Sequence, residues 1–511
     1  MIKYQTIWLL LCLSAATGTQ AQQVPAAKDP ATVIISPEMP LSVKDTTFRK
    51  QILQWSTQQM DEQNYKKIKA QPSSVYFPGK VKDGAVLISR AVHISHQQIR
   101  STLEPIVSKL DYSSPWADNL YSTALYAEPG EFIEVTIPRD LVGKGVGVQI
   151  GIHSDNLGEW VAGTEDWRRM PMIVKQVVLK KETTRISSPF GGLIYITASP
   201  KSATWEADIT LNRVVAAPYF QAGKTSRAEW LQQLQDNKAP WGELATEHVI
   251  LTLPDSVLQK VQYPDSVMKI WDLIIGGEME LAQIPMPFYR PQRMVIDEQI
   301  GGGFMHSGYP IMIHHSPSRH LLSADVMADP KKLLIPSRGG ANWGFFHEIG
   351  HNMQNMDWVF DGTTEVSNNL FSLYMFDRLT GGLDDAHSAI SSANTQKDIR
   401  KYFAGGADYE KWKKDPFLGL ILFRQLQEGF GWESFKTFFR QLHEMAILDP
   451  SGAYADTDQK KRDLWALKLS RITGRNLAPF FEKWGVVISQ GVKDQLAPLP
   501  GWMPYNFPPA D

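Results

Sequence analysis

Two histidines and a glutamate in the string "FFHEIGH" stand at a spacing that suits metal chemistry. His347 and His351 are four residues apart, so on a helix their imidazoles lie on one face, about one turn apart. Glu348 stands beside them. In the pattern H-E-x-x-H, two histidines bind zinc and the glutamate acts as general base on a water molecule. Because an ordinary buried helix can contain the same string by chance, the interpretation depends on a further ligand.

Three acidic residues downstream compete for the position of that third ligand. In the metzincin arrangement the ligand lies six residues after His351, where Asp357 stands, but that arrangement needs a glycine where the sequence has Gln354. Asp361 stands in an Asp-Gly turn. Glu365 begins a second helical stretch and lies one residue off its apolar stripe, so it can face the histidines. We therefore expect Glu365 as the third ligand, in preference to Asp357 and Asp361.

Two histidines and one glutamate form a donor set that is typical of a catalytic zinc site. Such a site keeps one position open for water or substrate, and a purely structural site has no use for a base such as Glu348. The only cysteine, Cys12, would be removed with a signal peptide cleaved after Ala21, so the ligands must be histidine, aspartate or glutamate. We expect Zn²⁺, which with Glu348 activates water and polarises the scissile carbonyl of a peptide.

Other polar and aromatic residues stand in the same half of the chain, and ordinary packing is the simpler interpretation for most of them. The stretch "MHSGYPIMIHH" is a candidate edge strand for pairing with substrate, and it offers candidate donors for an oxyanion. Trp343 either stacks on a sugar or braces the start of the helix. We interpret His387 and His443 as residues of helix surfaces or cores. The edge-strand candidates are His306, Tyr309, His314 and His315.

The elements that must position these residues change in character along the chain. Residues 44–69 have helical spacing, and short apolar alternations such as "FIEVTI", "VGVQIGI" and "LIYIT" then predict a β-sandwich. Later segments read as helical, except for two strands around the Gly-rich turn of "RMVIDEQIGGGFMHSGYPIMIHH". The predicted fold class is α+β and multidomain. The expected parts are a leader and helix (22–71), a β-sandwich domain (72–217) and an α-rich, zincin-like catalytic domain (218–511).

Composition and the N-terminus bear on the setting in which the protein works. The 511 residues carry a formal net charge of −2, which gives no reason to expect nucleic acid or an anionic membrane as the main partner. Lys3, the apolar run "IWLLLCLSAA" and the small-residue site before Gln22 predict a signal peptide over residues 1–21. A lipoprotein anchor at Cys12 is the alternative, but a small residue is missing before it. We expect a secreted, periplasmic or cell-surface protein without a transmembrane segment.

The site and its surroundings resemble a known family. "NWGFFHEIGHNMQ" followed by "TTEVSNNLFSLY" is similar to the enhancin-like metallopeptidases, gluzincins that include viral enhancins and bacterial mucin-degrading enzymes. Their pattern is H-E-x-x-H with a glutamate a short distance on, which matches His347, Glu348, His351 and Glu365. Further landmarks in the expected order are "SSPFGGLIYI", "APYF", "APWGEL", "MHSGYP" and "SRITGRNLAPFFEKWG". The resemblance runs from about Tyr121 to the C-terminus.

The resemblance implies a β-sandwich packed on a zincin domain, and activity on glycoproteins that are often O-glycosylated mucins. The expected function is therefore an exported zinc metalloendopeptidase whose partner is a glycoprotein or mucin substrate. Two rivals remain open at this point. One is a peptidase without preference for glycans, and the other is a glycan-binding surface protein whose zinc site is not catalytic.

Overall fold

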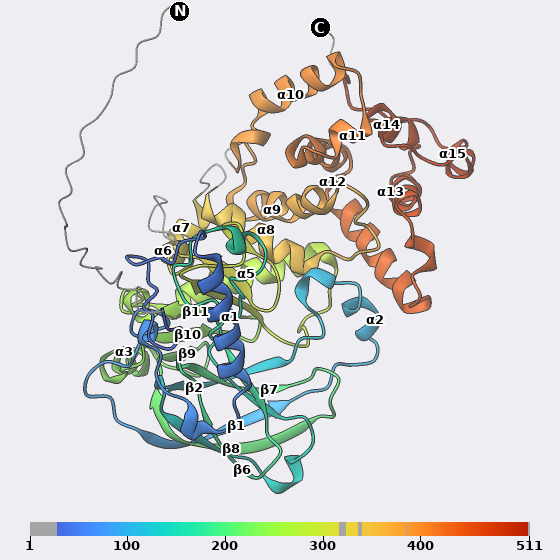
Figure 1. Cartoon of the computed structure of the whole chain (residues 1–511). Helices are drawn as coiled ribbons and strands as arrows, with labels where there is room; N and C mark the ends of the chain where they lie inside the picture. The colour runs from blue at the N-terminus through green and yellow to red at the C-terminus, as the bar shows by residue number, and fades with distance from the viewer. Residues whose placement is uncertain (1–27, 316–322, 336–339, 385, 509–511) are drawn as a thin grey trace, which may run out of the picture.

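The structure is a computed structural model that describes residues 28–315, 323–335, 340–384 and 386–508. The expected signal peptide and Cys12 lie outside the described residues. A β-rich region forms the lower part of the molecule in Figure 1, and helices of the second half of the chain form the upper part. The sequence predicted this order, a β-rich region before an α-rich one, within an α+β fold. Within the described residues, no helix is both long and apolar enough to span a bilayer.

The β-rich region consists of two layers that share one hydrogen-bonded path. Strand neighbours follow the order β5-β4-β7-β2-β8-β3-β6, and β1 pairs with β8. Apolar residues from both layers, such as Val148 and Ile194 on one and Val135 and Leu211 on the other, meet in one core. The strands are β1 (Ile88–His96), β2 (Asn119–Ala127), β3 (Phe132–Thr136), β4 (Gly147–Ile150), β5 (Lys175–Val178), β6 (Thr183–Ser187), β7 (Gly192–Ala198) and β8 (Trp205–Ala216).

The first helix is shorter than expected. Helix α1 (Thr46–Asp61) covers only the first two thirds of the stretch 44–69, and a 3₁₀ turn, η1 (Tyr65–Lys67), follows it. The Asn64 side chain accepts a hydrogen bond from the backbone of Lys66, which favours a turn over continued helix. The prediction of one helix to residue 69 was therefore wrong.

A second sheet has six strands, of which the sequence predicted only the two around the Gly-rich turn, β12 and β14. Its order is β13-β14-β12-β11-β10-β9, and β11, β12 and β14 run parallel to one another. Parallel strands are buried on both faces, so they lack the alternation of polar and apolar residues that marks a half-exposed strand. The strands are β9 (Tyr219–Gln221), β10 (Trp241–Ala245), β11 (Val249–Pro254), β12 (Gln292–Asp297), β13 (Met305–His306) and β14 (Ile311–His314).

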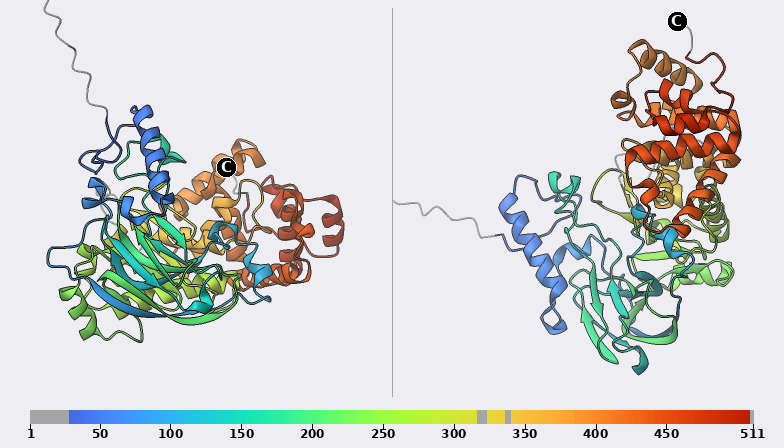
Figure 2. Two further views of the ribbon diagram at one scale, coloured as in Figure 1. Left: turned by 60° about the horizontal axis from the view of Figure 1, so that its bottom comes forward. Right: turned by 90° about the vertical axis from the view of Figure 1, so that its right-hand side faces the viewer.

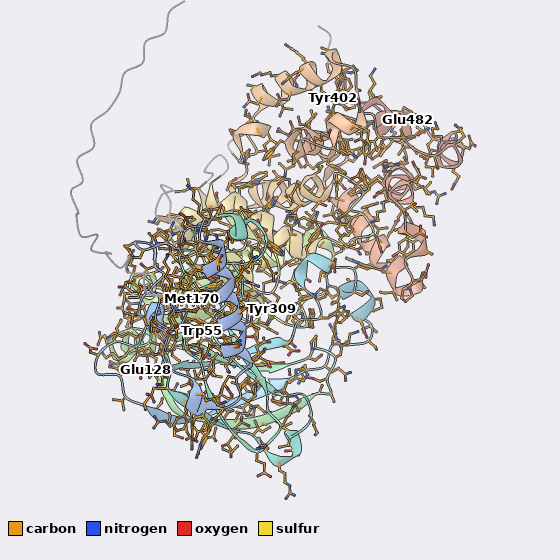
Figure 3. The ribbon with its side chains drawn as sticks, viewed as in Figure 1. Trp55, Glu128, Met170, Tyr309, Tyr402 and Glu482 are labelled. Atoms are coloured by element: carbon orange, nitrogen blue, oxygen red, sulfur yellow. The ribbon has the colours of Figure 1, made fainter. Side chains whose placement is uncertain are left out.

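Helices pack on this sheet, and the described residues after β14 form helices and the segments that connect them (Figure 2). The first of them are α2 (Glu104–Val107), α3 (Arg227–Asp236), α4 (Asp255–Leu258), α5 (Pro264–Ala282), α6 (Ser323–Met327), α7 (Pro330–Leu334), α8 (Ala341–Met353) and α9 (Thr364–Thr380). The C-terminal helices are α10 (Ser392–Ala404), α11 (Tyr409–Trp412), α12 (Pro416–Leu448), α13 (Asp458–Thr473), α14 (Ala478–Lys483) and α15 (Gln490–Leu496). Figure 3 labels Tyr402 and Glu482 among these C-terminal helices.

Buried charged groups join the β-rich region to the second sheet. Arg293 of β12 pairs with Glu243 of β10 at 2.9 Å and donates to the carbonyl oxygen of Leu120 in β2 at 2.6 Å. Arg169 pairs with Asp297 at the end of β12 at 2.7 Å. Because these arginines are fully buried, removing one partner of either pair would leave an uncompensated charge. The two parts are therefore fixed to each other.

Candidate metal centre

Helices α8 and α9 form the frame of the candidate site, and they approach closely. Phe346, Ile349 and Met353 repeat at helical spacing on α8 and are buried. Gly350 lies at the crossing with α9. A Cβ atom on Gly350 would lie only 2.8 Å from Cβ of Phe371. The glycine between the two histidines therefore permits a contact that a larger residue would prevent.

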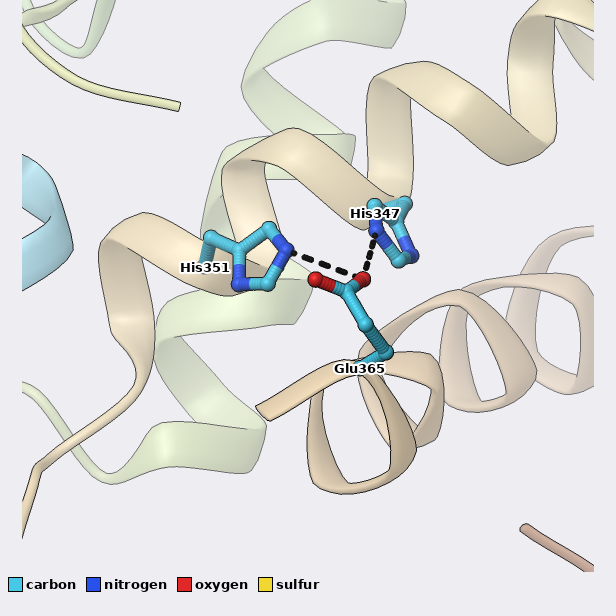
Figure 4. A group of neighbouring side chains, drawn as sticks. All are labelled: His347, His351 and Glu365. Carbon is cyan, nitrogen blue, oxygen red and sulfur yellow. Dashed lines mark ion pairs between the residues drawn. The ribbon is translucent and has the colours of Figure 1, made fainter. Parts of the chain in front are cut away.

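Three side chains converge across this helix pair (Figure 4). The Oε2 atom of Glu365 lies 3.0 Å from Nε2 of His347 and 3.4 Å from Nε2 of His351. The candidate ligand atoms of the three residues all lie within 4.8 Å of one another. The structure thus brings together the two histidines of α8 and the expected third ligand, Glu365, which lies in the first turn of α9.

The other ring nitrogens of both histidines are held by amide side chains. Nδ1 of His347 lies 2.8 Å from Oδ1 of Asn369, and Nδ1 of His351 lies 2.7 Å from Oε1 of Gln354. An amide oxygen accepts, so each Nδ1 carries a proton, and each Nε2 faces the shared point, where an ion would bind its lone pair after loss of any Nε2 proton. Gln354 donates in turn to the carbonyl oxygen of Thr364 at 2.8 Å. Such contacts fix the orientation of metal ligands and are typical of metal sites.

The charges of the group are strongly coupled. Hydrogen bonds with His347 and then His351 hold the pKa of Glu365 well below its usual range, against the effect of burial. Burial lowers the pKa of His347, but the hydrogen bond to Glu365 and the charge of Glu348 outweigh it and leave this pKa raised. Burial raises the pKa of Glu348, although the two histidines oppose the shift. The group is thus one anionic ligand, two imidazoles and a desolvated carboxyl.

This donor set fits zinc. Zinc binds imidazole nitrogen and carboxylate oxygen, and a site with three protein ligands leaves a position for water or substrate. Both Nε2 atoms are oriented toward the carboxylate of Glu365, whose side chain is about 50% exposed. The carboxylate side of the group is therefore accessible to solvent. Glu348, only 8% exposed, stands next to the group without belonging to the three donors.

The rival acidic residues lie elsewhere. Asp357 is buried and pairs with Lys109 at 3.3 Å, and it also accepts a hydrogen bond from Tyr454. Asp361 pairs with Lys413 at 2.6 Å on the surface. Both carboxylates are therefore engaged outside the group, and the structure does not bring either of them to the histidines.

The remaining candidates fall into different surroundings. His306 lies beside α8: both ring nitrogens are bonded, to the carbonyl oxygen of Ser307 at 2.9 Å and to Asp155 at 2.8 Å. Trp343 is buried and packs on Phe376, which favours bracing over contact with a sugar. The others are placed as follows: Tyr309 under Arg290, His314 in β14, His315 bonded by its backbone to Asp297, His387 stacked on Phe417, and His443 buried against Ala282.

Sequence reasoning missed the residues that support the three donors. Asn369 lies four residues after Glu365, so helical spacing was a signal for placing both on one face of α9. Tyr112 is a different case. Its ring centroid lies 5.2 Å from that of His351, yet it stands more than two hundred residues earlier in the chain. No local pattern identifies such a residue, because only the tertiary fold brings it to the site.

Two family models match adjoining parts of the chain. The model described as peptidase M60, enhancin and enhancin-like, matches residues 213–485, which is more than half of the 511 residues. The model described as the N-terminal domain of M60-like peptidases matches residues 107–212. The matched segments include the helix pair with the three donors as well as most of the β-rich region.

Similar proteins are found among curated sequences and among solved structures. TRPM8 channel-associated factor 2 from Homo sapiens is 36% identical over 403 residues, which are 78% of this chain and 41% of that protein. The chain thus spans about two fifths of the length of such relatives. The IMPa metallopeptidase from Pseudomonas aeruginosa matches with a TM-score of 0.60 at 15% identity, over 85% of this chain and 53% of that one. IMPa has also been solved in complex with an O-glycopeptide and with T-antigen.

The ZmpB metallopeptidase from Clostridium perfringens gives a TM-score of 0.59 at 17% identity, and the match covers 81% of this chain and 80% of that one. At such identities the likeness to solved structures shows a shared fold. Together with the match to the longer family model, it accounts for the β-rich first part and the α-rich second part of the chain.

Proposed function

Because the chain belongs to the peptidase M60 family, enhancin and enhancin-like, we propose that it is a zinc-dependent metallopeptidase that cleaves peptide bonds in glycoproteins. The observation that carries the proposal is the convergence of His347, His351 and Glu365 beside the buried Glu348. Metal-assisted hydrolysis requires protein donors for the ion and a further group that can accept a proton. The three donors and the carboxyl group of Glu348 meet these two requirements.

Each residue has a distinct task in this proposal. When bound, zinc would supply a Lewis acid that polarises the scissile carbonyl and makes water more acidic. His347, His351 and Glu365 hold the ion. Glu348 accepts the proton of the attacking water and passes it to the leaving amine. The raised pKa of Glu348, which burial causes, makes its ionised form a stronger proton acceptor than a surface carboxylate.

Replacement of the base tests this mechanism. Glu348→Gln keeps the size of the side chain and both imidazoles but removes the proton acceptor. We expect zinc to bind near one equivalent, by titration, while hydrolysis of a mucin-type substrate falls by about two to four orders of magnitude. Activity comparable to that of the unchanged protein would refute the mechanism.

We further propose that the substrate is O-glycosylated. Support comes from the shared fold with IMPa, which has been solved with an O-glycopeptide and with T-antigen. In physical terms, contacts to the sugar supply binding energy that places the peptide over the site. One peptide should be compared in glycosylated and bare forms, with cleavage followed by mass spectrometry. Faster cleavage of the bare form would leave a peptidase without glycan preference.

A second candidate function is binding without catalysis. The observation in its favour is that curated relatives are named as channel-associated factors and not as peptidases. In that case the zinc group would be structural, and a buried base at position 348 would have no use. A protein that binds zinc and the glycopeptide but releases no cleavage product with Glu348 intact would support this candidate and exclude the first.

The setting and the domain limits complete the proposal. We propose export through a signal peptide over residues 1–21, and determination of the N-terminal residue of the mature protein tests it, with Gln22 expected first. We also propose residues 72–217 and 218–511 as the sandwich and catalytic domains. Limited proteolysis followed by mass spectrometry tests these limits, since cleavage concentrates in exposed connecting segments.

A further inference from the structure

The phenol of Tyr112 lies against the candidate metal group without a task in the mechanism above. Its ring is tilted against His351, with 5.2 Å between the ring centroids. Its hydroxyl oxygen lies 3.2 Å from Oγ1 of Thr364, the residue immediately before Glu365. The side chain is only partly buried. A polar group of a distant segment is therefore held next to one donor, His351, and next to the residue that precedes a second donor, and it is partly accessible to solvent.

The backbone on both sides of Tyr112 is fixed by the catalytic part of the chain. Buried Arg290 donates from Nη2 to the carbonyl oxygens of Ser113 at 3.0 Å and Ser114 at 2.9 Å. On the other side, the backbone N–H of Met356 donates to the carbonyl oxygen of Lys109 at 2.9 Å. Since α8 ends at Met353, this second bond ties the Tyr112 segment to the end of the helix that carries the histidines. The position of the phenol is thus preorganised.

Peptide hydrolysis needs a hydrogen-bond donor at the oxygen that becomes negative, and two of the edge-strand candidates, His306 and Tyr309, are held by contacts elsewhere. Both ring nitrogens of His306 already donate, to Ser307 and to Asp155. The hydroxyl oxygen of Tyr309 accepts a hydrogen bond from the backbone N–H of Leu120 at 3.3 Å, which places this side chain at the junction with β2 (Figure 3). His306 would have to give up an existing contact before it could reach a substrate, and the hydroxyl of Tyr309 contacts β2 and not the three donors.

The contact of Tyr112 with Thr364 does not require the hydrogen of the phenol. The hydroxyl of Thr364 can act as the donor in their contact, because either oxygen can take that part. The Tyr112 oxygen then accepts, and its own hydrogen remains free to point toward the open position of the site.

We propose that Tyr112 donates a hydrogen bond to the scissile carbonyl oxygen as negative charge develops there. This inference rests on the proposed peptidase function. Water oxygen forms a bond to the carbonyl carbon, the carbonyl electron pair moves to oxygen, and Glu348 takes the proton of the water. The C–N bond then breaks, and the same proton goes to the leaving nitrogen. Tyr112 keeps its proton throughout and stabilises the oxyanion by its O–H dipole.

Tyr112→Phe tests the proposal, because phenylalanine keeps the ring against His351 and removes only the hydroxyl. Loss of one oxyanion donor costs about 100-fold to 1000-fold in kcat. We expect that fall in kcat with KM changed less than about threefold, because the contact forms in the transition state and not in the bound substrate. Zinc should still bind near one equivalent. A phosphinic peptide, which mimics the tetrahedral carbon, should lose affinity by a factor similar to the loss in kcat.

Tyr454→Phe is the matched control. It removes a tyrosine hydroxyl that hydrogen-bonds Asp357 outside the three donors, so kcat and inhibitor affinity should remain unchanged. Activity of Tyr112→Phe within threefold of the unchanged protein, while Glu348→Gln is inactive, would overturn the Tyr112 proposal and leave the peptidase standing. A fall in zinc affinity with unchanged kcat at saturating zinc would also overturn it and assign Tyr112 to support of His351. Absence of cleavage in the unchanged protein would refute both proposals.

Discussion

Replacement of Gly350 by alanine should disturb metal binding although it changes no donor. The added Cβ would collide with Oδ1 of Asn368 and would lie 2.8 Å from Cβ and 3.1 Å from Cγ of Phe371 on α9. Cβ of Phe371 belongs to the helix frame and cannot rotate away. Contacts between such carbons become ordinary only from 3.4 Å, so the two helices must separate locally by about 0.6 Å.

That displacement exceeds what a zinc site tolerates. Donor distances are defined to within about 0.2 Å, and the histidines stand on α8 whereas Glu365 stands on α9. We expect zinc affinity to fall at least tenfold, or about 1.4 kcal/mol. For the metal-free protein we expect a smaller net change in the free energy of unfolding. A gain of about 1 kcal/mol in helix propensity offsets part of an overpacking cost of about 1–3 kcal/mol.

Competition with a chromophoric chelator measures the affinity, and thermal unfolding in chelator measures stability. Gly344→Ala is the matched control on the same helix. Its Cβ would meet only the Sδ and Cε atoms of Met305, at 3.0 and 3.3 Å, and the end of a methionine side chain can give way. Gly344→Ala should therefore bind zinc normally. Equal zinc affinity of the Gly350→Ala and unchanged proteins would refute the claim that close approach of α8 and α9 sets the site.

Three further outcomes follow from the site and the core. Glu365→Ala should lower zinc affinity sharply in a metal titration whereas Asp357→Ala leaves it nearly unchanged; the reverse order would favour the metzincin geometry. Asn369→Ala should weaken zinc binding by about 10-fold to 100-fold, because Nδ1 of the first histidine loses its acceptor; unchanged affinity would contradict this. Burial lowers the pKa of His153 and of His443 to about 4, from 6.5. Between pH 7 and pH 5 the unfolded chain therefore binds protons that the folded chain does not, which lowers stability by about 2 kcal/mol per histidine. Urea unfolding at both pH values checks this, and His443→Gln should show a smaller loss than the unchanged protein.

The sequence predicted the fold where local patterns report local surroundings. Strands such as Phe132–Thr136 alternate because one face is buried, and α3 begins at Ser226 with a capping box involving Glu229. The prediction failed for β10 and β11, which are almost wholly buried. Without a polar face there is no alternation, and a short apolar run does not distinguish a strand from a buried helix.

The sequence likewise predicted some residues of the candidate site and missed others. His347, Glu348 and His351 are set by helical spacing within one turn, and Glu365 follows from the stripe of the next helix. The fixed orientation of His351 by Gln354 did not follow, since the sequence reasoning weighed position 354 only as a missing glycine. The phenol of Tyr112 did not follow either, because its contact with the site depends on how the β-rich region sits against the helices.

Metal binding and catalysis depend on different parts of the chain. All three donors lie within 19 residues, His347 to Glu365, on one helical hairpin. Tyr112 instead reaches the site from the part of the chain that precedes the second sheet. Under the functions proposed above, ion binding thus depends on one short segment, whereas turnover also depends on how the β-rich part packs against the helices. We therefore expect that substitutions in the β-rich part of a related protein can abolish catalysis while its metal donors remain intact.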